Sequence, residues 1–97
     1  MVTEYYKKYL KSPQWAAKRQ QVFATYGKRC YACRKAPKIL HVHHVDYARL
    51  GHEAMGDLIP LCVPCHKELT KIYKRNRRRG LRRVTMEFVK RKRASRE

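Results

Sequence analysis

The sequence has few acidic residues, no long apolar run and no apolar segment near its first residue. Its 97 residues include 7 Asp and Glu against 25 Lys and Arg. No stretch approaches the roughly 18 consecutive apolar residues that a membrane-spanning helix needs. The first residues also lack the apolar core of a secretion signal. These absences predict an intracellular protein that is not in a membrane, and the length predicts a single domain.

The shortage of acidic residues leaves a formal net charge of +18. A net charge of about 2 to 8 is enough to keep a small domain in solution, so an excess this large predicts an anionic partner. Nucleic acid is the commonest partner of such proteins. An anionic membrane surface is the alternative, but it requires a long amphipathic helix with an apolar, aromatic face. The sequence shows no convincing helix of that kind.

The positive charge is concentrated in the last part of the chain. Residues 71–97 hold 13 Lys and Arg against 2 Glu, a net charge of +11. We assign residues 80–97 as a basic C-terminal tail. Contacts from such side chains to a phosphate backbone are largely independent of base sequence and weaken in salt. The arginines expected to make these contacts are Arg75, Arg77, Arg78, Arg79, Arg82 and Arg83.

A helix is predicted over residues 13–26, within an N-terminal helical support at 1–27. Ser12 suits the N-cap and Pro13 the first helical position. Large side chains then recur at spacings of three and four, which places them on one face. Gly27 predicts the helix end, because glycine readily adopts the left-handed conformation of a C-terminal cap. The residues on this face are Trp15, Arg19, Val22, Phe23 and Tyr26.

Two strands are predicted in the middle of the chain. Residues 39–45 are rich in β-branched side chains and alternate in polarity, which favours a strand. A shorter strand is expected at 57–61, where Pro60 restricts it to an edge or an end of the sheet.

Two further helices are predicted after these strands. One begins near Pro64 and reaches about Arg79. Thr85 then caps a last helix over residues 86–94. The run 76–83 between them is the expected hinge.

The four cysteines form two C-x-x-C pairs separated by 28 residues, Cys30 with Cys33 and Cys62 with Cys65. Two cysteines three residues apart reach one ion from a tight turn, and two such turns complete the tetrahedron that Zn²⁺ prefers. Two disulfides or a redox-active pair are the alternatives. In a reducing compartment this spacing favours metal ligands. Four thiolates leave no open position, so we predict a structural zinc site.

This zinc is expected to be necessary for folding. Zinc binding in small domains is worth about 10–16 kcal/mol, whereas a typical domain has a net stability of only about 5–15 kcal/mol. We therefore expect no stable fold without the metal.

Five histidines lie within 26 residues, and cysteine already saturates the predicted zinc. These residues are His41, His43, His44, His52 and His66. His66 directly follows Cys65, near the expected start of a helix. A hairpin held by the same cysteines would bring His43 or His44 opposite His66. Neutral imidazoles around a divalent ion with open positions would make a catalytic site.

The order of motifs in this part of the chain resembles the HNH endonucleases of the zinc-knuckle type. The resemblance includes residues 42–47, residues 50–53, and the run 57–62 that leads into Cys65 and His66. The run 9–15 and Arg19 are also similar to small stand-alone members in phage genomes. The resemblance covers about residues 5 to 70, and the tail lies outside it.

The resemblance implies a fold and a reaction. The fold is a small α+β protein with a ββα-metal, treble-clef-like unit at 28–79, stapled by the four-cysteine zinc site and flanked by an N-terminal helix and a basic helical tail. The implied reaction is hydrolysis of phosphodiester bonds in DNA by a one-metal mechanism. The implied cofactors are structural Zn²⁺ and a catalytic Mg²⁺, Mn²⁺ or other divalent ion. If the chain is phage-encoded, it would act in the host cytoplasm.

Site roles carry over by position. His44 resembles the general base, which at an unperturbed pKa near 6.5 accepts a proton at neutral pH. His43 and His66 resemble the ligands of the catalytic ion. Asp57 stands where the family has the Asn that restrains the loop and orients the base, so the amide donor is lost. Thr70 stands where some members have a second histidine on the helix.

One geometric requirement follows from the adjacent histidines. Neighbouring residues on a regular strand point to opposite faces. For His43 and His44 to serve one site, the strand must end or bulge there. His41 shares the parity of His43.

Two functions remain open from the sequence. The first is a metal-dependent DNA endonuclease or nickase, and the second is a non-catalytic zinc-stapled module that binds DNA or RNA. The charge and the cysteines fit both, whereas the three histidines His43, His44 and His66 favour the enzyme. A third hypothesis is an accessory nuclease that acts with phage packaging proteins.

Overall fold

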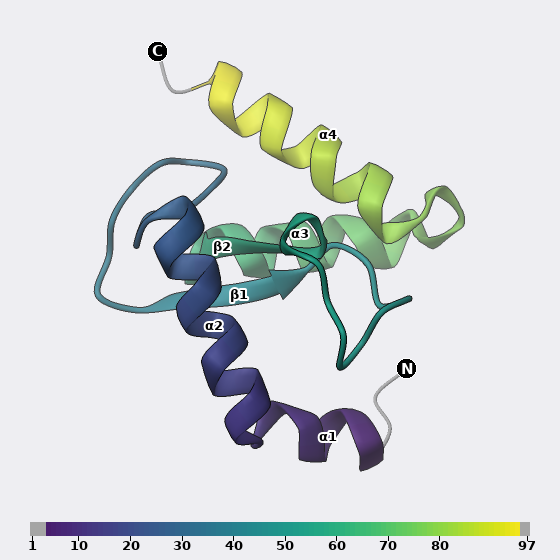
Figure 1. Cartoon of the computed structure of the whole chain (residues 1–97). Helices are drawn as coiled ribbons and strands as arrows, with labels where there is room; N and C mark the ends of the chain where they lie inside the picture. The colour runs from purple at the N-terminus through teal and green to yellow at the C-terminus, as the bar shows by residue number, and fades with distance from the viewer. Residues whose placement is uncertain (1–3, 96–97) are drawn as a thin grey trace.

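The computed structural model describes residues 4–95, which form a small α+β protein with four α-helices and a two-stranded antiparallel sheet (Figure 1). The helices are α1 (Glu4–Leu10), α2 (Pro13–Tyr26), α3 (Val63–Arg75) and α4 (Leu81–Ala94). The strands are β1 (Leu40–His44) and β2 (Leu58–Cys62), and two 3₁₀ turns are η1 (Met55–Asp57) and η2 (Arg77–Arg79). No helix of this described part is long and apolar enough to cross a membrane. The ends of the predicted segments that fall on residues 1–3 and 96–97 lie outside it.

Helix α2 begins and ends where the sequence predicts. The Ser12 side-chain oxygen accepts a hydrogen bond from the Trp15 backbone N–H at 3.1 Å, which satisfies one of the free donors at the helix start. At the other end Gly27 has a φ of 83°, and its N–H bonds to the Phe23 carbonyl at 2.9 Å. The predicted helix over residues 13–26 is confirmed.

The two predicted strands are confirmed with their ends shifted by one residue. They pair antiparallel in an uninterrupted register in which His43 lies opposite Ile59 and His44 lies opposite Leu58. Pro60 lies in the middle of β2, which a two-stranded sheet tolerates because each strand has one free edge. Because the register has no bulge at this point, His43 and His44 point to opposite faces of the sheet.

Each face of the sheet carries its own apolar cluster, one under α2 and one under α3 and α4 (Figure 1). The cluster under α2 contains Tyr9, Trp15, Val22, Val42 and Leu58. The other contains Ile59, Leu61 and Leu69 with Val84, Phe88 and Val89 of α4, together with the buried cysteines. The short sheet is therefore packed between α2 on one face and α3 with α4 on the other.

The ends of the last two helices differ from the prediction. Helix α3 stops at Arg75 rather than Arg79, since the Asn76 side chain turns back to donate to the Ile72 carbonyl at 2.8 Å. Helix α4 starts at Leu81, directly after Gly80, rather than at residue 86. The expected hinge at 76–83 is thus a short turn followed by the first residues of α4.

The predicted basic tail is, over its described part, a helix of the core. Thr85 was expected to cap this helix, and that prediction is wrong, because Thr85 lies inside α4 and is fully buried. Phe88 is 1% exposed and belongs to the same cluster as Cys30. Tertiary packing that sequence periodicity did not reveal accompanies a helix that starts five residues earlier than predicted.

Removal of the Phe88 ring tests this packing. We expect Phe88→Ala to lower the free energy of unfolding of the zinc-loaded protein by about 3–5 kcal/mol, as for other buried aromatic side chains. Met86→Ala on the same helix is the matched control, because Met86 is 40% exposed and surface substitutions change stability by about 0.5 kcal/mol or less. Urea unfolding measures both, and equal midpoints for the two variants would contradict the placement of α4.

Candidate functional site

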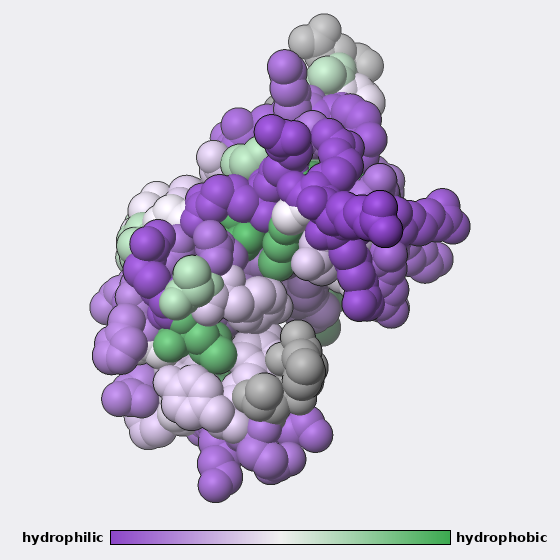
Figure 2. Space-filling view, turned by 90° about the vertical axis from the view of Figure 1, so that its right-hand side faces the viewer, coloured by the Kyte–Doolittle hydropathy of each residue, from purple (hydrophilic) through white to green (hydrophobic). Residues whose placement is uncertain are grey.

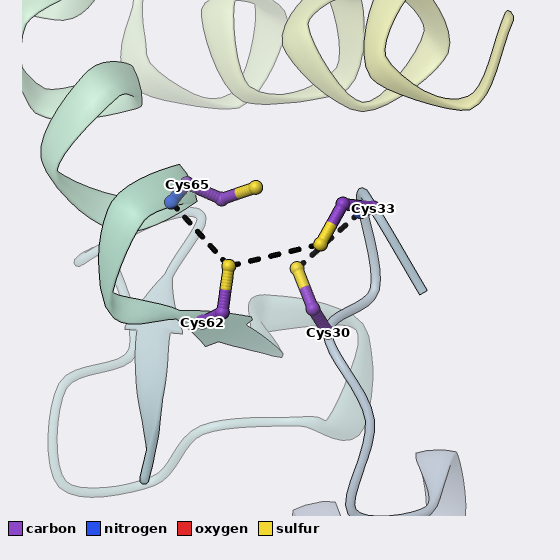
Figure 3. Close-up of side chains that lie close together, drawn as sticks. All are labelled: Cys30, Cys33, Cys62 and Cys65. Carbon is purple, nitrogen blue, oxygen red and sulfur yellow. Dashed lines mark hydrogen bonds between the residues drawn. The ribbon is translucent and has the colours of Figure 1, made fainter. Parts of the chain in front are cut away.

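Four cysteines from two distant parts of the chain converge at one end of the sheet. Cys30 and Cys33 come from the turn after α2, Cys62 ends β2, and Cys65 lies in the first turn of α3 (Figure 3). Their Sγ atoms all lie within 4.8 Å of one another, and Cys33 Sγ is 3.7 Å from Cys62 Sγ. All four thiols are free of disulfides. The predicted pairing of the two C-x-x-C motifs into one cluster is confirmed.

The chemistry of this cluster fits a metal ion. Zn–S bonds of about 2.3 Å in a tetrahedron place the sulfurs about 3.8 Å apart, close to the distance between Cys33 and Cys62. Burial alone would raise the pKa of Cys30, but backbone N–H groups, first those of Cys62 and Cys33, outweigh it and lower the pKa to about 7. The Cys65 N–H likewise donates to Cys62 Sγ at 3.5 Å. The four cysteines can hold one metal ion, consistent with structural zinc.

Three histidines gather on the face of the sheet that α3 covers. His41 and His43 project from β1, and His66 follows Cys65 in the first turn of α3. His41 Nδ1 lies 2.8 Å from His66 Nδ1, and the ring centroids of His43 and His66 are 5.2 Å apart. The structure therefore brings the two predicted metal ligands, His43 and His66, together and adds His41 to them.

Burial favours the neutral form of two of these imidazoles, those of His43 and His66. Burial, followed by the nearby rings of His66 and His44, lowers the pKa of His43 to about 3. Burial and then His41 also lower the pKa of His66. A neutral imidazole keeps one nitrogen lone pair, which is the form that binds metal ions.

His44 lies on the opposite face, away from these three residues. Its side chain is 2% exposed, and its Nε2 is 2.7 Å from Glu53 Oε2. The ring stacks on Trp15 and on Tyr47, with centroids 5.0 and 4.9 Å apart. For His43 and His44 to serve one site, the strand was expected to end or bulge there. Strand β1 ends at His44 without a bulge, and in this structure the two rings have different partners, Thr85 for His43 and Glu53 for His44.

Glu53 is a buried residue that the sequence reasoning did not single out. It accepts a hydrogen bond from the Tyr9 hydroxyl at 2.6 Å in addition to its contact with His44. Burial alone would raise the pKa of Glu53, but the bonds from Tyr9 and His44 outweigh it and lower the pKa. One signal in the sequence bore on this contact. Side chains alternate along a strand, so the position of His44 next to His43 directs its ring to the other face of the sheet.

Asp57 fixes the loop between the strands. Its carboxylate accepts hydrogen bonds from Arg49 at 2.8 and 2.6 Å, from Arg82 at 2.9 Å, and from the Ala54 N–H at 3.0 Å. The Arg49 hydrogen bond is the main reason that the pKa of Asp57 falls to about 2. These contacts restrain the loop and tie it to α4 through Arg82. The structure places Asp57 beside arginines rather than beside His44.

A pocket of about 300 Å³ adjoins His66 on the outer side of α3. Its other lining residues are Lys67, Thr70, Lys71 and Lys74. The Thr70 hydroxyl donates to the His66 carbonyl at 2.9 Å, so this side chain braces the helix. Three lysines beside His66 form a place suited to a phosphate group.

The predicted DNA-contacting arginines lie at the end of α3, in η2 and at the start of α4, and all are exposed. Arg82 forms ion pairs with Asp46 and Asp57, and Arg79 pairs with Glu87. Arg82 thus helps to hold the loop between the strands. Figure 2 shows hydrophilic side chains gathered over this part of the surface, on the side of the α3–α4 connection. The remaining candidates in this group are Arg75, Arg77, Arg78 and Arg83.

No protein-family model, no curated protein and no solved structure matches this chain.

Metal analysis tests the cysteine cluster. We expect the purified protein to carry one tightly bound ion per chain, zinc by its ligand chemistry, and Cys65→Ala to lose it. His52→Ala is the control, since His52 is an exposed loop residue.

Removal of the ion with a chelator should abolish the cooperative melting transition, measured by circular dichroism. The small apolar clusters alone do not supply enough stability to keep the chain folded. Unchanged melting after complete removal of the metal would contradict this role.

Proposed function

We propose that this protein is a metal-dependent DNA endonuclease or nickase of the HNH type, which hydrolyses phosphodiester bonds. The observation that supports it most is the convergence of His41, His43 and His66, the last of which borders a pocket lined with lysines. A module that only binds nucleic acid needs the positive charge and the zinc. It does not need three imidazoles gathered at one face.

The two metals have different roles in this proposal. Zn²⁺ in the four-cysteine cluster is structural, because four thiolates leave no coordination position for substrate. It fixes the start of α3 through Cys62 and Cys65, and His66 is the next residue. The structural ion therefore sets where the catalytic histidine of α3 stands relative to β1.

We assign the catalytic divalent ion, Mg²⁺, Mn²⁺ or another, to His43 and His66. Both side chains are neutral at pH 7, as their lowered pKa values indicate, and their rings meet edge-on between β1 and α3, with centroids 5.2 Å apart. When bound there, the ion supplies charge that stabilises the phosphate and the leaving 3′ oxygen. The buried His43 is held rigidly, and the half-buried His66 borders the pocket.

We assign the role of proton acceptor to His41, in place of His44. A general base must reach the water from which it takes a proton. His44 is enclosed by two aromatic rings and engaged by Glu53, whereas His41 is half-buried and on the same face as His43 and His66. Its 2.8 Å contact with His66 also allows a proton to be shared between the two rings.

The substrate is held by lysine and arginine. Lys67, Lys71 and Lys74 line the pocket beside His66, and the exposed arginines at the α3–α4 connection extend this basic surface. These groups recognise phosphates and carry little base-sequence information. With a net charge of +18 on the whole chain, we expect binding and cleavage to weaken steeply as salt is added.

Cleavage of supercoiled plasmid DNA at low salt tests the proposal. We expect the zinc-loaded wild type to nick or linearise the plasmid with Mg²⁺, Mn²⁺ or Ni²⁺. Loss of a metal ligand or of the general base should lower the rate by about 10²–10⁴-fold, so His66→Ala and His41→Ala should be nearly inactive. His52→Ala is the matched histidine control and should cleave like the wild type.

His44→Ala separates the two assignments of the base. It leaves the buried Glu53 without one of its two side-chain partners, so we expect a loss of stability of about 1–3 kcal/mol, with cleavage per folded molecule reduced less than in His41→Ala. A fully inactive His44→Ala with unchanged urea midpoint, beside an active His41→Ala, would return the base to His44. If the wild type shifts DNA on a gel but cuts with none of the ions, the non-catalytic zinc-stapled module would replace the enzyme.

A further inference from the structure

Thr85 of α4 contacts His43, one of the histidines of the site. Its Oγ1 lies 3.0 Å from His43 Nε2. Thr85 is 0% exposed and His43 is 6% exposed, so water does not replace either partner. Residue 85 is 42 positions from residue 43, and a helix that was expected to be a tail provides the contact.

The position of Thr85 is fixed on both sides along α4. Arg82, one turn earlier, binds Asp57 at 2.9 Å. Phe88, one turn later, is buried in the core. A side chain between two such anchors has little freedom, so its hydroxyl is a rigid partner for the imidazole.

We propose that Thr85 is a positioning residue that holds His43 in one tautomer. The Thr85 oxygen accepts the Nε2–H of His43, and the Nδ1 lone pair of the same ring is thereby left free for a divalent ion. Histidine ligands commonly donate their second ring nitrogen to such a partner, which sets both the tautomer and the orientation of the ring. The use of that lone pair rests on the proposed function, whereas the tautomer itself does not.

The contact explains why a threonine lies inside a basic helix. Its neighbours Val84, Phe88 and Val89 are apolar core residues, and a buried hydroxyl among them requires a hydrogen-bond partner. His43 is that partner in the structure. The helix that carries much of the positive charge is therefore also part of the support of the histidine site.

Nitrogen NMR of the histidine rings tests the tautomer directly. In the zinc-loaded wild type at pH 7, we expect His43 to give the pattern of a neutral ring protonated at Nε2 alone. Thr85→Val keeps the shape but removes the oxygen, so a second tautomer should appear. Thr85→Ser retains the oxygen and should keep the wild-type pattern. A wild-type His43 protonated at Nδ1, or a pattern that Thr85→Val leaves unchanged, would overturn the proposal.

The metal requirement of cleavage provides the second measurement. Loss of a partner behind a metal ligand typically costs 10–100-fold in metal affinity or activity. We expect the Mn²⁺ concentration for half-maximal cleavage to rise by about this factor in Thr85→Val and to recover in Thr85→Ser. Met86→Leu on the exposed side of α4 is the control and should match the wild type. An unchanged Mn²⁺ requirement in a folded Thr85→Val would contradict the positioning role.

The two measurements distinguish the failure of the nuclease proposal from the failure of the role of Thr85. If no form of the protein cuts DNA but the NMR pattern changes as described, the nuclease proposal falls and the role of Thr85 in holding His43 stands. If the wild type cuts DNA and Thr85→Val alters neither the pattern nor the metal requirement, the role of Thr85 falls alone.

Discussion

Cys62 is the point at which the parts of this protein are joined. It ends β2, it caps α3 by accepting the Cys65 N–H, and its sulfur lies 3.7 Å from that of Cys33 in the turn after α2. A metal ion held by the four thiolates would tie these three elements at one place. Over residues 4–95 the sheet has two strands, and an isolated pair of strands is marginally stable at best. The placement of α3 on the sheet, and with it the direction of His66, depends on this junction.

The regular register of β1 then decides which histidines can act together. With α3 fixed on one face, His41 and His43 point toward His66, and His44 points away into the cluster under α2. There it is held by Glu53 and the aromatic rings. One strand thus serves two purposes. One face places His41 and His43 against His66, which borders a basic pocket, and the other builds a buried polar contact through His44. The assignment of the base to His41 rests on this geometry.

Most features that could be predicted from the sequence are local. The N-cap at Ser12 and the two strands follow from spacing and residue chemistry over a few positions. The pairing of the C-x-x-C motifs is long-range, and it could be predicted because a metal ion needs four ligands that each motif supplies only in part. The contacts of His44 with Glu53 and of His43 with Thr85 require knowledge of which surfaces meet, and the second joins residues 42 positions apart. The packing of α4 was also not predicted. Its many basic residues resemble those of a solvated tail, whereas its four buried side chains pack in the core.

Ni²⁺ binding to the zinc-loaded protein, followed through the ring signals of the histidines, tests the central claim most directly. Ni²⁺ suits imidazole ligands, and as a paramagnetic ion it affects the rings that bind it first. The account predicts that one equivalent shifts or broadens the signals of His43 and His66 with His41, that the exposed His52 responds only later, and that His66→Ala abolishes the effect. Equal response at all five histidines, or binding that survives the loss of His66, would contradict a metal site between β1 and α3.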